Sequence, residues 1–425
     1  RDNNTIESNK EENLSIISVL NENEKHKFIN FNKKIKYLKS LKKVSEKEKK
    51  HLEGFQKDEP KKPKEFNINE AEPPKYRDFG EIYKKELETL EKLNPILFNL
   101  QKKKDDYDLT VKNGVTIKGY TGIDIVKTGT GNITGATITT TGLGVYLRGS
   151  YTKPVVNITN STITSTEGYA IETRNYEWGY KKVDIKGSTI KGASHAICSE
   201  YGDIIIEDSL VVSTGTAYSI WANQSSIKLN NGAKIESDTA NGIYNHYNSW
   251  IYLNSGSSIK LTREDANGVY LPSNSYCGVV LNTGAKIETT GSSSYGINND
   301  GYDRTINIKG GEIISGNIGI RTRSYNNTVN VTGGTIKANT YGIYQYKHDD
   351  SQNGTVNMGD SEVVLDQNVP LVTGGQYGIY NEKGYVNFYN GRLRGTTSAL
   401  YGEFYKLRHA MKVVDIDEYE DPLES

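Results

Sequence analysis

Three close pairs of carboxylates are the residues of this chain whose spacing best suits general acid–base chemistry. The pairs are Asp300 with Asp303, Glu264 with Asp265, and Asp349 with Asp350. Each pair falls in a predicted loop, and none has an obvious carboxylate partner one repeat along the chain. We interpret all three as solvated loop charge and expect no catalytic residues.

Metal-ligating and thiol chemistry are equally sparse. The histidines are scattered at His26, His51, His195, His246, His348 and His409. No two have the spacing of zinc ligands, and no glycine-rich stretch matches a phosphate-binding loop, so we expect no metal site and no cofactor. Cys198 and Cys277 would lie on the order of 15 Å apart in the repeat described below, at about 4.8 Å per stacked strand. A disulfide needs Cα atoms within about 7 Å, so we predict two free thiols.

Aromatic residues carry the strongest signal for binding, since the chain has 30 tyrosines. They often follow a small residue and an aliphatic one, as at Tyr146, Trp221, Tyr244, Tyr270, Tyr344, Tyr380 and Tyr401. Predicted loops add Trp178, Tyr247 and Trp250. In stacked repeats these side chains would form a column, and we hypothesise an aromatic face that contacts sugars or protein. The alternative is a ladder of rings that only stabilises the stack.

Charge is balanced overall, with 52 basic and 52 acidic residues among 425. This balance argues against a general nucleic-acid binder, which needs a basic surface. No apolar run approaches the ~18 residues of a membrane-spanning helix. Residues 1–107 are densely charged and hold only two of the 42 glycines, Gly54 and Gly80. Two different segments therefore join near Tyr107.

The second segment contains an irregular repeat of about 20–30 residues. A small residue followed by an aliphatic one recurs at pairs such as Gly122-Ile123, Ala196-Ile197, Gly242-Ile243, Gly319-Ile320 and Gly378-Ile379. Two further short strands with alternating apolar and polar residues complete each repeat. The pattern predicts a mainly β chain, a right-handed parallel β-helix solenoid of about 12 turns over residues 108–402.

This pattern resembles the pectate-lyase-like right-handed parallel β-helix superfamily. It is closest in character to repetitive bacterial surface-protein and adhesin regions, such as autotransporter passengers. The motifs that carry the resemblance are Gly242-Ile243-Tyr244-Asn245, Gly378-Ile379-Tyr380-Asn381 and Gly333-Gly334-Thr335-Ile336. The resemblance implies the fold but little chemistry, because the same solenoid serves enzymes and inert rods. The Asn-Thr-Asp, Asp-Asp and Gly-His-Gly motifs of polygalacturonases are absent.

The remaining segments have predicted roles of their own. We expect a charged helical arm over 1–57, a proline-rich linker over 58–77, a helical N-terminal cap over 78–107, and a C-terminal cap with an acidic tail over 403–425. The apolar stripe of the arm is a candidate assembly surface. Its residues are Leu14, Ile17, Leu20, Ile35, Leu38 and Leu41.

Together these observations favour an extracellular structural or interaction protein and not an enzyme. The first residue is Arg1, which we interpret as a mature secreted chain from a bacterial surface or an excised segment. The leading hypothesis is a self-assembling surface or filament subunit, whose partners are copies of itself or a surface protein or glycan. A monomeric adhesin that binds glycan or host protein is the first alternative. A polysaccharide-active enzyme is the second.

Overall fold

The structure is a computed structural model that describes residues 109–126, 129–148, 154–174, 180–272, 277–347, 354–360, 369–402 and 404–407. Internal contacts divide the chain into Arg1–Asp105 and Asp106–Ser425, close to the compositional join. The predicted arm, linker and N-terminal cap lie outside the described residues, as do Trp178 and most of the predicted C-terminal cap.

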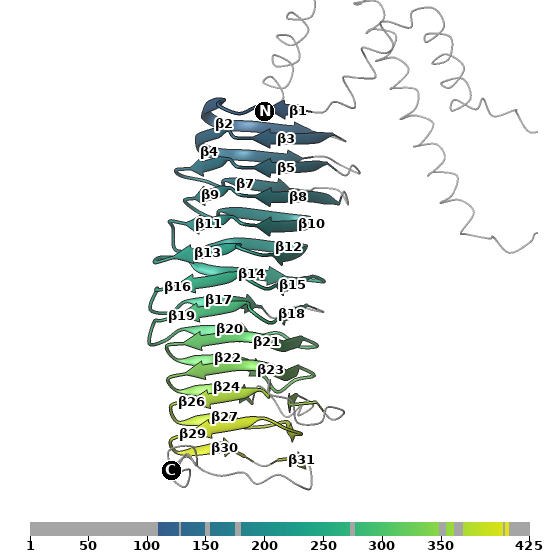
Figure 1. Cartoon of the computed structure of the whole chain (residues 1–425), viewed down its shortest axis with the longest axis vertical. Helices are drawn as coiled ribbons and strands as arrows, with labels where there is room; N and C mark the ends of the chain where they lie inside the picture. Colours follow the sequence, from purple (N-terminus) through teal and green to yellow (C-terminus); the bar gives the residue numbers. More distant parts are fainter. Residues whose placement is uncertain are drawn as a thin grey trace, which may run out of the picture. The chain divides into compact units, whose positions relative to one another are not determined.

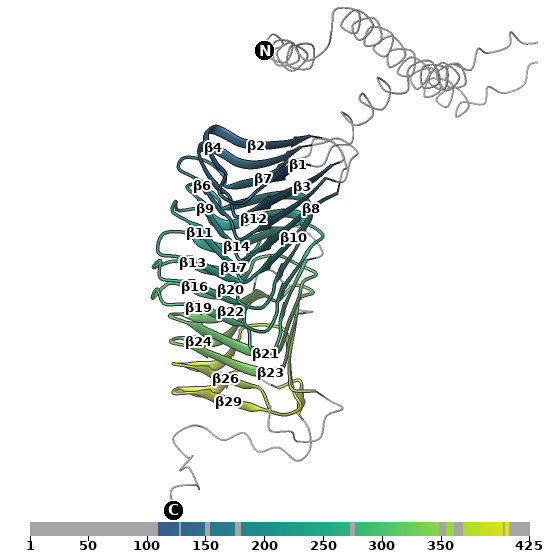
Figure 2. The same ribbon diagram turned by 45° about the horizontal axis from the view of Figure 1, so that its top comes forward.

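The described part of Asp106–Ser425 is a parallel β-solenoid of about 11 turns, as Figure 1 shows. Its mainly β, parallel architecture confirms the prediction from the repeat. A turn contributes short strands to three faces, and each strand pairs in parallel with its counterpart in the next turn. Figure 2 shows β14, β17, β20 and β22 stacked above one another.

Each face is named here after a residue type that recurs on it. The asparagine face contains β1 (Leu109–Val111), β3 (Thr130–Thr134), β5 (Val155–Thr159), β8 (Lys181–Lys186), β15 (Trp250–Leu253), β18 (Gly278–Leu281), β25 (Thr355–Met358), β28 (Tyr385–Phe388) and β31 (Lys406–Leu407). The threonine face contains β6 (Thr162–Ser165), β9 (Thr189–Gly192), β11 (Leu210–Ser213), β13 (Lys234–Ser237), β16 (Ser258–Leu261), β19 (Lys286–Thr289), β26 (Leu371–Gly374) and β29 (Arg392–Gly395). The tyrosine face contains β7 (Ile171–Arg174), β14 (Asn241–His246), β17 (Asn267–Leu271), β20 (Tyr295–Asn299), β22 (Ile318–Arg323), β24 (Tyr341–Tyr346), β27 (Tyr377–Asn381) and β30 (Ser398–Tyr401).

Long strands turn a corner and belong to two faces each. They are β2 (Thr116–Val126), β4 (Thr137–Arg148), β10 (Ile197–Glu207), β12 (Tyr218–Leu229), β21 (Thr305–Ser315) and β23 (Thr328–Ala338). The amino-terminal half of β12, for example, pairs with β14 on the tyrosine face, and its other half pairs with β15 on the asparagine face.

The core is a set of aliphatic ladders. On the tyrosine face one ladder runs through Ile197, Ile220, Ile243, Val269, Ile297, Ile320, Ile343 and Ile379, all fully buried. Each such side chain contributes roughly 1.5–3 kcal/mol relative to an exposed position. No single turn could bury its apolar side chains alone, so a turn becomes stable only when it stacks on its neighbours.

The small residue of the repeat has a steric cause. A Cβ added at Gly242 would meet the carbonyl oxygen of Gly268 in the next turn, and one at Gly268 would meet that of Gly296. The small residue and the aliphatic one both point inward, so backbones approach too closely for a longer side chain. This contact explains why the motif recurs at every turn.

Polar side chains also form ladders between turns. On the asparagine face the amide of Asn330 donates to Asn307, that of Asn357 to Asn330, and that of Asn387 to Asn357, over 2.7–2.8 Å. Ser161, Ser188 and Ser209 form a similar series, in which each backbone N–H donates to the next serine hydroxyl at 3.0 Å. Such ladders satisfy buried polar groups.

Two smaller expectations concern thiols and membranes. Cys198 and Cys277 are both buried and form no disulfide with each other, as predicted. The part of the chain that the structure describes contains no helix long and apolar enough to cross a membrane.

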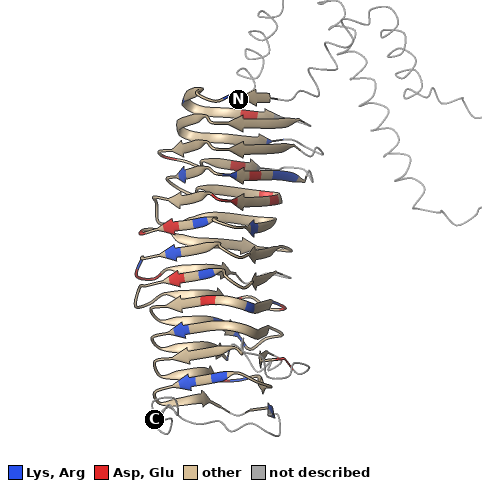
Figure 3. Cartoon of the chain, viewed as in Figure 1, with Lys and Arg blue, Asp and Glu red and all other residues tan. Residues whose placement is uncertain are grey.

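In the view of Figure 3 basic and acidic residues are interleaved along the strands. Pairs such as Lys286 with Glu288 and Glu312 show this mixing directly.

Candidate functional site

The residue after each small–aliphatic pair forms one continuous column on the tyrosine face. Strand register aligns Asp124, Tyr146, Glu172, Cys198, Trp221, Tyr244, Tyr270, Asn298, Arg321, Tyr344, Tyr380 and Tyr401. Seven of the predicted aromatic residues therefore share this column. Two polar residues, Asn298 and Arg321, separate its aromatic parts.

The first aromatic cluster consists of Tyr218, Trp221, Tyr244 and Tyr270. Trp221 stacks on Tyr244 with ring centroids 5.9 Å apart, and Tyr244 lies 5.7 Å from Tyr270. Tyr218, in the neighbouring column, packs edge-on to Tyr244 at 5.1 Å and stacks on Tyr270 at 6.2 Å. All four rings are half-buried, so one side of the cluster faces solvent.

The second aromatic cluster consists of Tyr341, Tyr344, Tyr377, Tyr380 and Tyr401. Tyr380 stacks on Tyr401 at 4.3 Å with an interplanar angle of 9°, and Tyr341 stacks on Tyr380 at 4.7 Å. Tyr344 and Tyr377 meet Tyr380 edge-on at 5.5 and 5.2 Å. Tyr401 ends the column and is 46% exposed.

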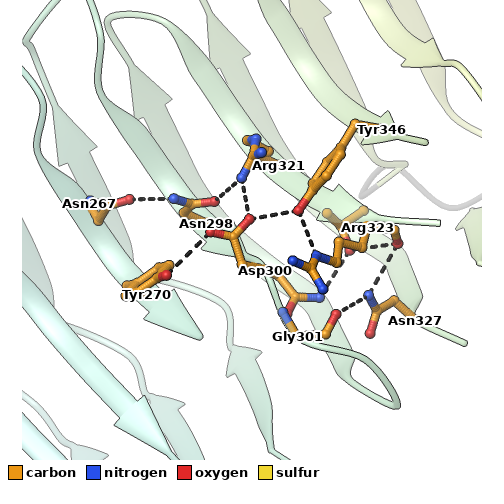
Figure 4. A network of polar contacts seen from close by, with 11 residues as sticks. Asn267, Tyr270, Asn298, Asp300, Gly301, Arg321, Arg323, Asn327 and Tyr346 are labelled. Carbon is orange, nitrogen blue, oxygen red and sulfur yellow. Dashed lines mark hydrogen bonds and ion pairs between the residues drawn. The ribbon is translucent and has the colours of Figure 1, made fainter. Parts of the chain in front are cut away.

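A polar network joins the two clusters, as Figure 4 shows. The carboxylate of Asp300 forms an ion pair with Arg321 and accepts hydrogen bonds from the hydroxyls of Tyr346 at 2.7 Å and Tyr270 at 3.3 Å. Arg321 also donates to Asn298 at 3.0 Å, and its guanidinium lies 3.9 Å from the ring centroid of Tyr346. The turn before Asp300 thus fixes its Oδ2 through Tyr270, and the two turns after it fix Oδ1 through Arg321 and Tyr346.

The network continues on both sides of Asp300. Arg323 donates from Nε to the hydroxyl of Tyr346 at 2.9 Å, and Asn298 donates to Asn267 at 2.8 Å. Tyr270 belongs to the first cluster, and Tyr346 lies 5.8 Å from Tyr344 of the second. The two clusters and the polar network between them, from Trp221 to Tyr401, therefore form one strip connected by direct contacts. Its groups are held in place before any partner arrives.

The interpretation of Asp300 as solvated loop charge is wrong. Its side chain is only 25% exposed, and Arg321 is 23% exposed. Glu264 and Asp265 fit that interpretation better: Asp265 is 61% exposed and pairs with Arg263, and Glu264 accepts from Ser292 in an exposed contact. Asp349 and Asp350 lie outside the described residues.

Three phenols of the strip have a raised pKa. Burial, with help from the hydrogen bond to Asp300, raises the pKa of Tyr346 to about 12. Burial also raises the pKa of Tyr218, and burial with the Glu382 carboxylate raises that of Tyr344. These three hydroxyls are therefore neutral near neutral pH, and those of Tyr346 and Tyr344 donate to Asp300 and Glu382.

Other predicted site residues lie apart from the two clusters. Trp250 starts β15 on the asparagine face, where its ring covers Gly278 and stacks near Tyr252 at 6.3 Å. Tyr247 lies in a turn, 38% exposed, with a positive φ of 54°. Tyr146 shares the column but contacts Arg148, at 5.7 Å, since Glu172 and Cys198 separate it from Trp221.

The sequence pattern did not predict a second set of outward-facing tyrosines, which lies beside the first column. Tyr218, Tyr295, Tyr341 and Tyr377 each precede the small residue directly, and at Tyr341 and Tyr377 the motif reads Tyr-Gly-Ile-Tyr. Two inward residues in succession leave both tyrosines on the outer side of the strand. Strict alternation would have placed one of them inside, which is why the pattern concealed the pair.

Within the described ranges no group of three or more His, Cys, Asp or Glu side chains could hold a metal ion. The strip offers aromatic stacking and hydrogen bonding, and Asp300 pairs with Arg321 at its centre. Comparison with protein-family models, curated proteins and solved structures finds no match for this chain.

Proposed function

We propose that this chain is an extracellular structural and interaction protein, a β-solenoid whose tyrosine face binds an extended glycan. The observation that supports the proposal is the connected strip from Trp221 to Tyr401. It covers about seven strand spacings, or roughly 34 Å. The likeness to bacterial adhesin and passenger regions, carried by the Gly-Ile-Tyr-Asn motifs, supports a place on a bacterial surface.

The chemistry of the strip suits sugars. Aromatic faces stack against the apolar C–H faces of pyranose rings, and neutral hydroxyl and amide groups bond their hydroxyls. Aromatic clusters at both ends of a polar network would let one chain of sugars lie along the solenoid axis. Asp300 accepts from three donors that fix its orientation, Arg321 and Tyr346 on one oxygen and Tyr270 on the other, so we assign its carboxylate a positioning role.

Glycan binding is tested with an array of neutral and acidic glycans and the full chain. We expect binding that falls at least tenfold in the double variant Tyr344→Ala, Tyr380→Ala, because two stacking rings are lost. The matched control is Tyr385→Ala, which removes a 38% exposed tyrosine from the asparagine face and should leave binding unchanged. Equal loss in both variants, or no bound glycan, would refute the proposal.

Self-assembly is the second candidate function, favoured by the last described turn. Tyr401 and Tyr405 are 46% and 62% exposed there. Exposed aromatic rings of this kind suit a contact with another copy of the chain. Light scattering over a concentration series tests it: a larger species that the variant Tyr405→Ser dissolves would support assembly, and a monomer at every concentration would exclude it.

A further inference from the structure

The last described turn is joined to the turn before it by two close pairs of tyrosines on two different faces. On the tyrosine face Tyr380 and Tyr401 stack at 4.3 Å. On the asparagine face Tyr385 and Tyr405 lie with ring centroids 4.5 Å apart and planes tilted by 52°. Both pairs join residues of adjacent turns, and the chain between them closes loops of about 20 residues each.

Three of these four rings are open to reagents in solution. Tyr385, Tyr401 and Tyr405 are 38%, 46% and 62% exposed, and Tyr380 is half-buried beneath Tyr401. Tyr401 and Tyr405 belong to the last described turn, whose short strands β30 and β31 each pair with one neighbouring turn among the described residues.

We propose that Tyr380–Tyr401 and Tyr385–Tyr405 are sites of oxidative tyrosine cross-linking that fasten the last described turn to the turn before it. The oxidant is hydrogen peroxide used by a haem peroxidase. Each phenol of a pair gives up one electron and one proton, and a carbon–carbon bond forms between the two ring carbons next to the hydroxyls. The hydrogens on those carbons move to the oxygens and restore two phenols, while one peroxide becomes two waters.

A covalent link matters most where a turn is held by few hydrogen bonds. Among the described residues β30 pairs only with β27 and β31 only with β28, whereas strands in the middle of the stack pair with a turn on each side. A covalent bond between successive turns limits how far the open state can spread, as a disulfide does. Links on two faces would hold both sides of the turn at once. Tyr380 and Tyr401 also belong to the strip proposed to bind glycan, so the Tyr385–Tyr405 link on the asparagine face tests the fastening role apart from glycan binding.

Another exposed pair gives a matched comparison within the same chain. Tyr302 and Tyr325 lie 5.7 Å apart and edge-on at 87°, and Tyr302 is 37% exposed. Exposure is therefore similar, but the rings are farther apart and perpendicular. If proximity and orientation decide the reaction, this pair stays unlinked under conditions that link the other two.

The test treats the dilute full chain with a peroxidase and hydrogen peroxide, then digests it and identifies linked peptides by mass spectrometry. We expect the 380–401 and 385–405 links, each with the loss of two hydrogens and a yield unchanged by dilution. The variants Tyr401→Phe and Tyr405→Phe keep a ring at each position and should remove one link each. Links only between chains, or a 302–325 link of equal yield, would overturn the proposal.

A second readout concerns the role of the links. Hydrogen exchange of the β30 amides, Ser398–Tyr401, should slow at least tenfold after oxidation of the natural chain. The double variant Tyr401→Phe, Tyr405→Phe should show no change on the same treatment. Unchanged exchange in a fully linked chain would show that the links form but do not fasten the turn, and would overturn that part of the proposal.

Discussion

Replacing Asp300 with asparagine removes the charge at the centre of the polar network and keeps the shape of the side chain. The carboxylate pairs with Arg321 and accepts hydrogen bonds from Tyr346 and Tyr270. The amide oxygen of the asparagine can still accept hydrogen bonds from Arg321 and Tyr346, but as a neutral group. Arg321 would then remain three-quarters buried beside Tyr346 without its counter-charge.

The expected cost follows from these contacts. A hydrogen bond to a charged group contributes about 1.5–3 kcal/mol and a neutral one about 0.5–1.5 kcal/mol, so three bonds lose roughly 3 kcal/mol in all. Water reaches the quarter of each side chain that is exposed and recovers part of this, which leaves about 2 kcal/mol. Urea unfolding and hydrogen exchange of the β20, β22 and β24 amides measure the change.

The control and the double-mutant cycle decide the interpretation. Asp265→Asn removes a 61% exposed carboxylate that also pairs with an arginine, and should change stability by less than about 0.5 kcal/mol. Arg321→Gln in the Asp300→Asn background should cost less than in the natural chain, because the ion pair is already broken. Additive losses, or equal effects at Asp300 and Asp265, would refute the view that the network stabilises the strip.

Other predictions concern buried charge, close packing and the thiols. Burial lowers the pKa of Lys181 to about 8, below its ordinary 10.5, so an unfolded Lys181 binds more protons than a folded one between these values. Its contribution to the unfolding free energy should rise from pH 8 to 10.5, and calorimetry of the natural chain against Lys181→Met should isolate that contribution. Gly242→Ala should destabilise by about 1–3 kcal/mol in urea unfolding because its Cβ meets the Gly268 carbonyl. Gly119→Ala, whose Cβ has only an ordinary 3.5 Å contact, is the tolerated control. Both cysteines should resist a thiol reagent until the chain unfolds, since both are buried.

The fold could be predicted because its cause is local and repeated. A small residue such as Gly242 marks where two backbones approach, and the following Ile243 marks the core ladder. Both signals recur once a turn, so errors at single positions do not displace the whole pattern. The sequence also placed Trp221, Tyr244 and Tyr270 on one line, since the same offset from the motif gives the same face.

The candidate site could be predicted only in part, because it is built across columns and turns. Asp300 lies two residues after Asn298 and meets Arg321 from the next turn and Tyr346 from the turn after that. These partners are 21 and 46 residues away, and nothing in the local sequence links them. A carboxylate at the end of a strand therefore resembled loop charge. The register between turns was needed to show its partners.

The structure bears on whether the tyrosines form a ladder or a binding face. Rings stacked on rings in successive turns would stabilise the solenoid by themselves, without polar residues between them. Instead the column changes to Asn298 and Arg321, and Arg321 is fixed by a carboxylate from the turn before and a ring from the turn after. Stacking within each cluster accounts for stability on either side of this break. In the glycan binding proposed above, the break would place oriented polar groups against sugar hydroxyls, between two aromatic surfaces that stack on sugar rings.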